Sequence, residues 1–268
     1  MIEFLSLCVI ILGAFIILFY ILRISIKSVK YSNSQVRFEG KLGTFIGKML
    51  LGFFLSMITL SIYVAWFIKD VTKFVVNSSS INDSNFEFQG KGSKLFLILL
   101  LSVYLPFPII LLATFMLEYI ITINQTYSFI YSLIYQGVEL IILIPYTYLA
   151  YKWMINIKFK DYQIKWQTEF GASCVKILVE MLLIMVTFGI YMPLGYLKLY
   201  KYFADKTEAE SSDKTLRFGY ELDKKSDFLF IWGQMLLTII TAGIYFPWAY
   251  SKIGKRILEK TYIENNAA

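Results

Sequence analysis

Long apolar segments alternate with short polar ones along the whole chain, a pattern typical of membrane proteins. A helix of roughly 20 apolar residues crosses the hydrocarbon core of a bilayer. By this criterion we predict six spans, at Phe4–Leu22, Met49–Ile68, Leu95–Leu117, Phe129–Tyr151, Ile177–Leu197 and Phe228–Ser251. Since lipid offers the backbone no hydrogen bonds, each span is expected to be helical. The predicted fold is an all-α membrane protein with about six transmembrane helices and both ends on one side.

The polar segments between the spans are each too short for a separate globular domain. We divide the chain into an N-terminal transmembrane anchor, residues 1–30, and a repeat-containing polytopic membrane domain, residues 31–268. The first span follows Glu3 rather than a basic stretch, so we expect a retained anchor and not a cleaved signal peptide. The loops on the two sides hold twelve Lys and Arg each, and this tie leaves the orientation open. The dense basic group near the C-terminus favours cytoplasmic ends.

An eight-residue motif recurs three times, each time in the second half of a predicted span. It is TLSIYVAW at 59–66, TFGIYMPL at 187–194 and TAGIYFPW at 241–248. Glycine and proline interrupt helices, so the motif predicts the end of a membrane helix. Its aromatic residues suit the headgroup level of a bilayer. The motif residues that we single out are Thr59, Ile62, Tyr63, Trp66, Thr187, Gly189, Tyr191, Pro193, Thr241, Gly243, Tyr245, Pro247 and Trp248.

Further repeated positions flank the motif on both sides. A lysine follows each motif tyrosine by ten residues, and the interfacial basic residues that we expect are Lys73, Lys201, Lys255 and Arg256. Short alternating segments precede the spans, VRFEG at 36–40 and FEFQG at 86–90, with looser copies TEFG at 168–171 and LRFG at 216–219. Alternation predicts extended, β-like segments, here at the membrane interface. Each unit is therefore expected to be an extended entry, a membrane helix, a break and a basic amphipathic turn, which together anchor the chain.

The F-x-F-x-G entry followed by a span ending in TxGIYxPW resembles the YjgN-like family of uncharacterised bacterial inner-membrane proteins. The resemblance covers roughly residues 36–262. The sequence departs from the pattern at Ser61 and Ala65, which replace Gly and Pro in the first copy, and around 95–117, which lacks the Gly-Ile-Tyr element. The resemblance implies a multi-pass protein of the bacterial inner (cytoplasmic) membrane, and it supplies no catalytic residues.

Composition excludes a soluble globular domain and offers little to catalysis. Apolar residues make up 57% of the 268 residues and charged residues 17%, against about 25% charged in soluble domains. The net charge of +7 comes from Lys and Arg clustered between the spans, where anionic lipid headgroups, rather than nucleic acid, are the expected partner. The chain has no histidine, no HExxH, no GxSxG and no phosphate loop. We therefore expect no enzyme, no metal and no cofactor.

Polar residues inside the predicted spans are the candidate functional residues, because a charge there costs about 2.5–3.5 kcal/mol. They are Glu139, Glu180, Lys176, Gln234 and Lys48. Lys48 and Lys176 share one repeat position, and Glu180 and Gln234 share another. Under one interpretation, Glu139, Glu180, Gln234 and Lys176 line a polar path. Under the other, the lysines reach back to the interface, Lys176 pairs with Glu180 four residues later, and Gln234 bonds across helices.

These interpretations lead to two hypotheses of function. The first is a transporter or channel-like protein for an ion or small solute. The alternative is a non-catalytic membrane scaffold or complex subunit that binds lipid headgroups and partner proteins. In either case the expected partners are membrane lipids, with a second copy of the chain or another membrane protein as further candidates.

Overall fold

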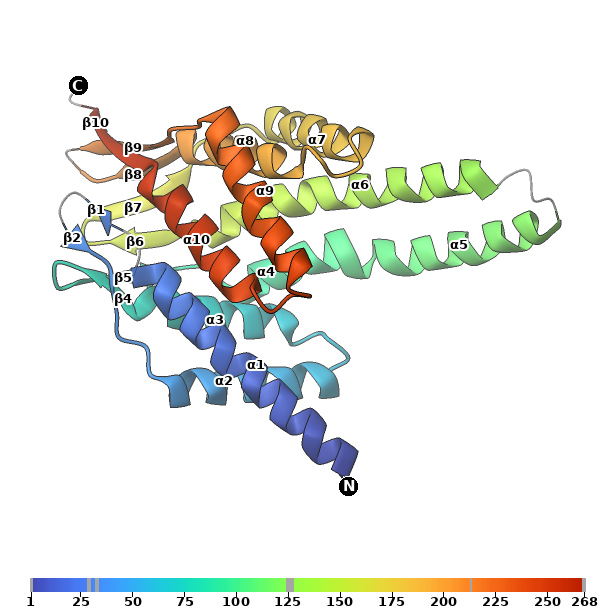
Figure 1. The fold of residues 1–268 in the computed structure, drawn as a ribbon, viewed down its shortest axis with the longest axis horizontal. Helices are drawn as coiled ribbons and strands as arrows, with labels where there is room; N and C mark the ends of the chain where they lie inside the picture. The colour runs from blue at the N-terminus through green and yellow to red at the C-terminus, as the bar shows by residue number, and fades with distance from the viewer. Residues whose placement is uncertain (1, 28–29, 32–33, 124–127, 213, 267–268) are drawn as a thin grey trace.

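The computed structural model describes residues 2–27, 30–31, 34–123, 128–212 and 214–266. It shows a mixed α/β fold, so the expectation of an all-α protein was wrong. A curled antiparallel sheet of eight strands lies at one end of the molecule, and the helices extend from it toward the other end (Figure 1). The strand order is β10-β9-β8-β7-β6-β5-β4-β3, so neighbouring strands follow one another in the sequence.

After α1 (Ile2–Lys27) and the short pair β1 (Lys30–Tyr31) and β2 (Ser34–Gln35), the chain repeats a strand–helix–helix–strand unit four times. Unit 1 is β3 (Arg37–Phe38), α2 (Leu42–Ile58), α3 (Val64–Asn77) and β4 (Ser79–Ile81). Unit 2 is β5 (Ser84–Phe88), α4 (Gly92–Leu99), the π-helix η1 (Leu100–Tyr104), α5 (Pro106–Ile123), α6 (Ser128–Met154) and β6 (Ile157–Phe159). Unit 3 is β7 (Tyr162–Trp166), α7 (Phe170–Val186), α8 (Met192–Asp205) and β8 (Thr207–Glu210). Unit 4 is β9 (Thr215–Tyr220), α9 (Lys224–Ile240), α10 (Phe246–Glu259) and β10 (Thr261–Asn266).

Units 1, 3 and 4 have helices of identical length. In each, a 17-residue helix leads through a five-residue turn into a 14-residue return helix. We call these helix pairs hairpins 1, 3 and 4, and the longer pair formed by α4–η1–α5 and α6 hairpin 2. A 17-residue helix is about 25 Å long, so hairpins 1, 3 and 4 reach less far from the sheet than hairpin 2 does (Figure 1).

The sheet forms because short turns connect the units and buried aromatic residues end the strands. β4 and β5 are joined by Asn82 and Asp83, both with left-handed backbone, as a tight hairpin turn requires. In every unit the last residue of the first strand is a buried aromatic, three residues before the helix cap. These residues are Phe38, Phe88, Trp166 and Tyr220.

The strands confirm three of the four predicted extended segments and correct the fourth. VRFEG contains β3, FEFQG contains most of β5, and LRFG at 216–219 lies inside β9, as expected. TEFG at 168–171 is not a strand but leads into α7. The residues equivalent to Phe38 in units 3 and 4 are therefore Trp166 and Tyr220, which an F-x-G pattern does not include.

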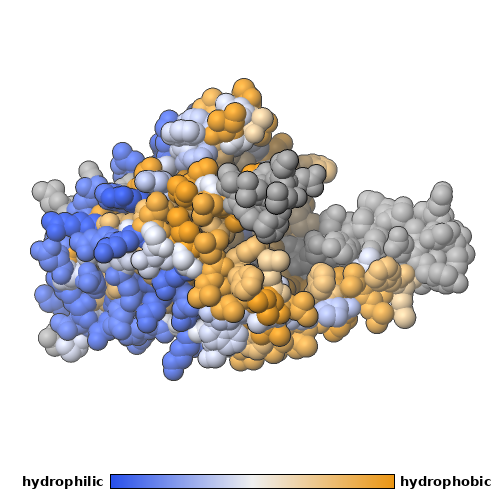
Figure 2. Space-filling model, turned by 90° about the horizontal axis from the view of Figure 1, so that it is seen from below, coloured by the Kyte–Doolittle hydropathy of each residue, from blue (hydrophilic) through white to orange (hydrophobic). Residues whose placement is uncertain are grey.

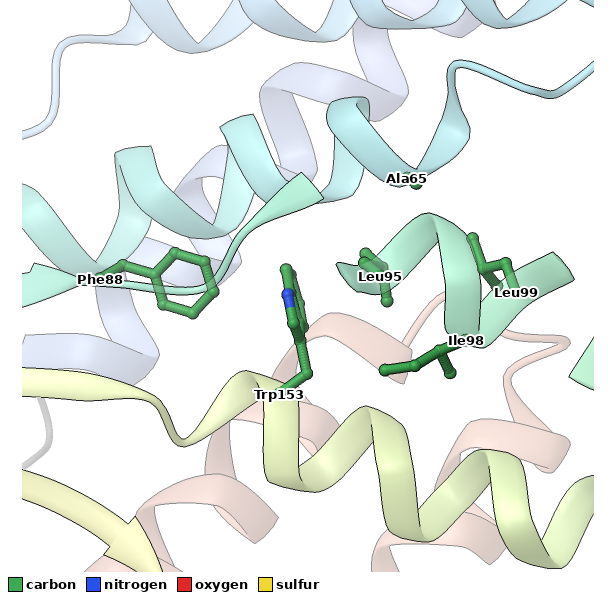
Figure 3. Packing of buried hydrophobic residues seen from close by; sticks show 6 residues of the cluster. All are labelled: Ala65, Phe88, Leu95, Ile98, Leu99 and Trp153. Atoms are coloured by element: carbon green, nitrogen blue, oxygen red, sulfur yellow. The ribbon is translucent and has the colours of Figure 1, made fainter. Parts of the chain in front are cut away.

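The apolar core lies between neighbouring hairpins, near the sheet. Figure 3 shows one such cluster, in which Trp153 of α6 and Phe88 of β5 pack beside residues of α3 and α4. The six buried members are Ala65, Phe88, Leu95, Ile98, Leu99 and Trp153. The indole N–H of Trp153 also donates to the backbone oxygen of Lys91 (3.0 Å), which fixes α6 against the start of α4. Each hairpin is thus held by its neighbours, as in other repeat proteins.

Three of the six predicted spans turn back instead of crossing. The segments 49–68, 177–197 and 228–251 each contain the end of one helix, a turn and the start of the return helix. Hydropathy could not reveal this, because the turn residues are as apolar as the helices that they join. The segments that are long and apolar enough to cross a membrane are Ile10–Lys27 and Gly92–Met116, among the described residues. α1 begins at the helical end of the molecule, and β10 lies at the sheet end (Figure 1).

Candidate membrane-embedding surface

The surface of the molecule divides along its long axis. Figure 2 shows hydrophilic residues gathered at the end that holds the sheet and apolar residues on the helices beyond it. The apolar side chains at the tips of hairpins 1, 3 and 4 are largely exposed: Leu60 by 87%, Phe188 by 96% and Ile244 by 75%. A soluble protein rarely exposes apolar residues in such groups, so the tips are a candidate site of contact with lipid or protein.

The repeated motif forms the turn at each of these tips. In hairpin 3, Thr187 ends α7, and Phe188 and Gly189 follow with φ of 50° and 82°. The N–H of Gly189 donates to the oxygen of Ile184 (2.8 Å), and the N–H of Phe188 donates to that of Met185 (3.0 Å). This is a Schellman ending, which satisfies the last carbonyls of a helix. Hairpins 1 and 4 make the equivalent bonds with Leu60–Ser61 and Ala242–Gly243.

The motif threonine closes the other side of the turn. The hydroxyl of Thr187 donates to the oxygen of Leu183 (2.7 Å) and accepts from the N–H of Tyr191 (3.1 Å). Thr59 and Thr241 make the same two bonds in hairpins 1 and 4. From Thr187 to Met192 every N–H has an acceptor, and Pro193 has no N–H to satisfy. The backbone N–H groups of the turn therefore need no water, which removes one main cost of placing such a turn in hydrocarbon.

The motif tyrosines lie at the tips of the short hairpins. Tyr63, Tyr191 and Tyr245 each precede the first residue of the return helix, at the tip farthest from the sheet. The lysines ten residues later, Lys73, Lys201 and Lys255, are back near the sheet. The predicted break is thus a reversal of the chain, and the tyrosines lie at the end of each short hairpin that is farthest from the sheet.

Two of the predicted polar residues meet inside hairpin 3. The ammonium of Lys176 lies 2.6 Å from Glu180 Oε1, the pair expected from their spacing. The hydroxyl of Tyr191 donates to Glu180 Oε2 (2.7 Å), across the turn. Glu180 is only 2% exposed. Both of its carboxylate oxygens are bonded to residues of its own hairpin.

The equivalent residue of hairpin 4, Gln234, makes the equivalent contact. Its Oε1 accepts from the hydroxyl of Tyr245 (2.9 Å), which in turn accepts from Lys252 (2.9 Å). No hydrogen bond joins Gln234 to Glu180 in the described part of the chain. Lys48 is half-buried on α2. Glu139 lies in α6, and its side chain is outside the described residues.

Hairpin 1 has no polar residue equivalent to Glu180 and Gln234, because an aromatic ring occupies that space. The position of Glu180 is occupied by Gly52, and a Cβ atom there would lie 2.0 Å from the ring of Phe67. The position of Phe67 is Gly195 in hairpin 3 and Ala249 in hairpin 4. Each hairpin therefore fills the same space with either one aromatic ring or a polar side chain bonded to the motif tyrosine.

A second polar cluster, which the sequence analysis missed, lies where hairpin 4 meets the sheet. Asp227 is 1% exposed, and its Oδ1 lies 2.7 Å from both Arg256 Nε and Lys260 Nζ. Burial favours a higher pKa for Asp227, but the hydrogen bonds from Lys260 and Arg256 outweigh it and hold this pKa below its usual value. Burial and the nearby charge of Asp227 raise the pKa of Tyr220.

Alignment of the units could have found this cluster. The position of Asp227 holds Phe45 in hairpin 1 and Ser173 in hairpin 3. The position of Arg256 holds Phe74 in hairpin 1 and Tyr202 in hairpin 3. The rings of Phe45 and Phe74 are 5.8 Å apart, and the hydroxyls of Ser173 and Tyr202 are 3.0 Å apart. One packing position thus holds an apolar, a neutral polar and a charged pair.

The remaining candidates lie near the sheet. Lys73 is exposed, Lys201 pairs with Asp205 (3.0 Å), and Lys255 lies 3.7 Å from Glu259. An open polar cavity of about 640 Å³ is found beside β3, lined by Lys27, Gln35, Val36, Arg37, Phe38, Glu39 and Asn82. None of the predicted polar residues lines it. Among the described residues, no group of acidic, histidine or cysteine side chains could hold a metal ion.

The fold and its surface define a repeat protein in which apolar helical hairpins project from one sheet. Comparison with known protein families identifies its family: a family model described as bacterial protein of unknown function (DUF898) matches residues 1–227. The chain belongs to this family, which agrees with its resemblance to the YjgN-like proteins. The match includes α1 and ends at Asp227, so most of unit 4 lies beyond it. No curated protein and no solved structure matches the chain significantly.

Proposed function

We propose that this protein is a non-catalytic membrane scaffold that inserts hairpins 1, 3 and 4 into a single leaflet. In this arrangement hairpin 2 crosses the bilayer, α1 lies against α2 and α10 of the short hairpins, and the sheet lies in water. The observation that carries the proposal is the exposed apolar tip, whose backbone N–H groups are all bonded within the turn. Bacterial inner-membrane location is part of the same proposal.

The position of the lysines supports a depth of one leaflet. Lys176 precedes Thr187 by eleven residues, about 16 Å along the helix, and Lys252 follows Tyr245 by seven, about 10 Å. Half of the hydrocarbon core is about 15 Å thick. With the backbone of these lysines near the headgroup level, the tips come to rest near the middle of the bilayer, and the ammonium groups bond on the tip side to Glu180 and Tyr245.

The contacts of the polar residues favour a scaffold over a transport path. Glu180 and Gln234 each bond to the tyrosine of their own hairpin instead of facing a shared cavity. Such closed groups neutralise polar atoms inside an apolar hairpin. A path would need polar groups left for a passing ion.

A depth measurement tests the proposal. Phe188→Cys, in a chain whose own two cysteines are replaced by serine, is labelled with a nitroxide and reconstituted in vesicles. We expect the label to be reached by oxygen and hardly by a water-soluble nickel complex. Glu87→Cys on β5 is the matched control, and its label should show the reverse.

Equal access of the nickel complex to both labels would refute insertion. A flux of protons or common ions that Glu180→Gln abolishes would replace the scaffold by a transporter. A tip reached from the far side of the vesicle by a membrane-impermeant maleimide would show that the hairpin is not confined to one leaflet.

A further inference from the structure

We propose that the seam between α9 and α10 binds the phosphodiester of an anionic phospholipid. The inference rests on the proposed function and adds to it which hairpin recognises lipid charge. Its two cations are Lys252 and Arg256, one helical turn apart on the same face of α10.

Arg256 is held in place on three sides. Its Nε lies 2.7 Å from Asp227 Oδ1, and its Nη2 donates to the hydroxyl of Ser226 (2.6 Å). The guanidinium carbon lies 4.5 Å from the centre of the Phe230 ring, a cation–π contact. The side chain remains 28% exposed. A guanidinium fixed in this way can bind phosphate with little further loss of conformational freedom.

The seam carries more positive charge than its carboxylate can neutralise. Asp227 is shared between Arg256 and Lys260, both at 2.7 Å, which leaves one excess positive charge. Lys252 adds a second, because its partner is the hydroxyl of Tyr245 (2.9 Å) and, within the described chain, no carboxylate pairs with it. Lys252 points toward Tyr245 at the tip and Arg256 toward Asp227, so a phosphodiester between them draws the Lys252 ammonium from the Tyr245 hydroxyl to one free oxygen while Arg256 binds the other.

The other short hairpins provide internal comparisons. The residues equivalent to Lys252 and Arg256 are Lys198 and Tyr202 in hairpin 3, and Asp70 and Phe74 in hairpin 1. Hairpin 4 alone among the three has both cations. We therefore expect selective binding of anionic lipid at hairpin 4, and not an even attraction along all three.

The surroundings point to a lipid rather than a free phosphate compound. On the tip side of Lys252, α10 exposes three aromatic residues, Phe246, Trp248 and Tyr250, each by half or more. This apolar surface is suited to acyl chains, and the cations lie between it and the sheet. A phospholipid, whose phosphodiester is attached to acyl chains, can contact both the cations and this apolar surface.

The test uses the full chain in detergent, with dissociation constants of the first bound lipid measured by native mass spectrometry. For the wild type we expect tighter binding of phosphatidylglycerol than of phosphatidylcholine. Lys252→Gln, which leaves the Asp227 pairs intact, should weaken phosphatidylglycerol binding about fivefold. Lys198→Gln is the matched control in hairpin 3 and should change it less than twofold. Added salt should reduce the difference.

Equal effects of Lys252→Gln and Lys198→Gln, or no preference for phosphatidylglycerol in the wild type, would overturn the inference. So would competition by glycerophosphoglycerol, the same headgroup without acyl chains, since it would make the site one for a soluble phosphodiester. The nitroxide measurement at Phe188 is repeated on Lys252→Gln. If insertion persists while lipid preference is absent, the inference fails and the scaffold proposal stands.

Discussion

Removal of the hydroxyl of Thr187 gives the sharpest test of the tip geometry. Thr187→Val keeps the shape and β-branching of the side chain and deletes its hydrogen bonds with Leu183, Ile184 and Tyr191. The carbonyl of Leu183 keeps the N–H of Thr187 as its partner (3.2 Å), but the N–H of Tyr191 loses its acceptor. The variant thus creates one unpaired donor at an apolar tip.

The expected magnitude follows from where that donor lies. Loss of a helix N-cap costs about 1 kcal/mol in water, where the freed N–H can bond to solvent. A buried donor without a partner costs about 1–3 kcal/mol, and in hydrocarbon several. We therefore expect a loss of about 1 kcal/mol in detergent that rises to about 2 kcal/mol or more in bilayers, measured as the free energy of unfolding by denaturant titration.

Thr147→Val in α6 is the matched control. Its hydroxyl also donates to a carbonyl four residues earlier, that of Leu143 (2.7 Å), but it caps no N–H. This control should change stability by less than about 0.5 kcal/mol. If Thr187→Val and Thr147→Val behave alike in bilayers, the motif threonine does not serve to satisfy the turn, and the role assigned to it is wrong.

Three further predictions concern individual contacts. Asp227→Asn should lower the free energy of unfolding by about 2–3 kcal/mol at pH 7, because it leaves two cations without their carboxylate. Since the folded-state pKa of Asp227 is lowered, its contribution is full above the ordinary aspartate pKa and is lost as pH falls below about 4. Acid titration should therefore separate wild type from Asp227→Asn near neutral pH and bring them together in acid, and parallel curves would contradict this. Gly189→Ala, at φ of 82°, should destabilise the protein by about 1–2 kcal/mol. Gly137→Ala, in an open helical position, should be neutral or stabilising. Thermal unfolding should therefore show a lower Tm for the first variant and an unchanged or higher Tm for the second. Glu180→Gln should cost less than Glu180→Leu, because glutamine can still accept from Tyr191, and denaturant titration of the pair would show it.

The sequence was sufficient to locate the repeats, and insufficient to show which way the chain leaves them. The motif from Thr187 to Leu194 correctly marks the end of a helix. Whether the chain then continues in the same direction or turns back depends on two residues with left-handed backbone, Phe188 and Gly189. Hydropathy contains no signal for a phenylalanine in that conformation. The return helix α8 was counted as part span and part loop because its first half is apolar.

The candidate site was predictable where its residues are close in sequence. Lys176 and Glu180 are four apart on one helix, and their ion pair followed from that spacing. Tyr191 reaches Glu180 only because the turn folds α8 back on α7, so their contact required the hairpin to be known. The sheet was missed for a related reason. Its strands are two to six residues long, and four of the seven pairings join strands separated by a whole helical hairpin, so that little short-range signal marks those pairs.

The equal lengths of the short hairpins are the strongest physical argument for a single leaflet. Hairpins 1, 3 and 4 start from the same sheet, three residues after an aromatic strand end, and use helices of 17 and 14 residues. Their tips therefore end at one level. The residues that pack between the two helices differ, however, from a phenylalanine pair in hairpin 1 to an ion pair in hairpin 4. A soluble repeat protein has no reason to keep both a common level and apolar tips. The middle of a bilayer is a plane that favours both, because any tip that stopped short would leave its apolar residues among headgroups, and any that went farther would drive the basic ends of its helices into hydrocarbon.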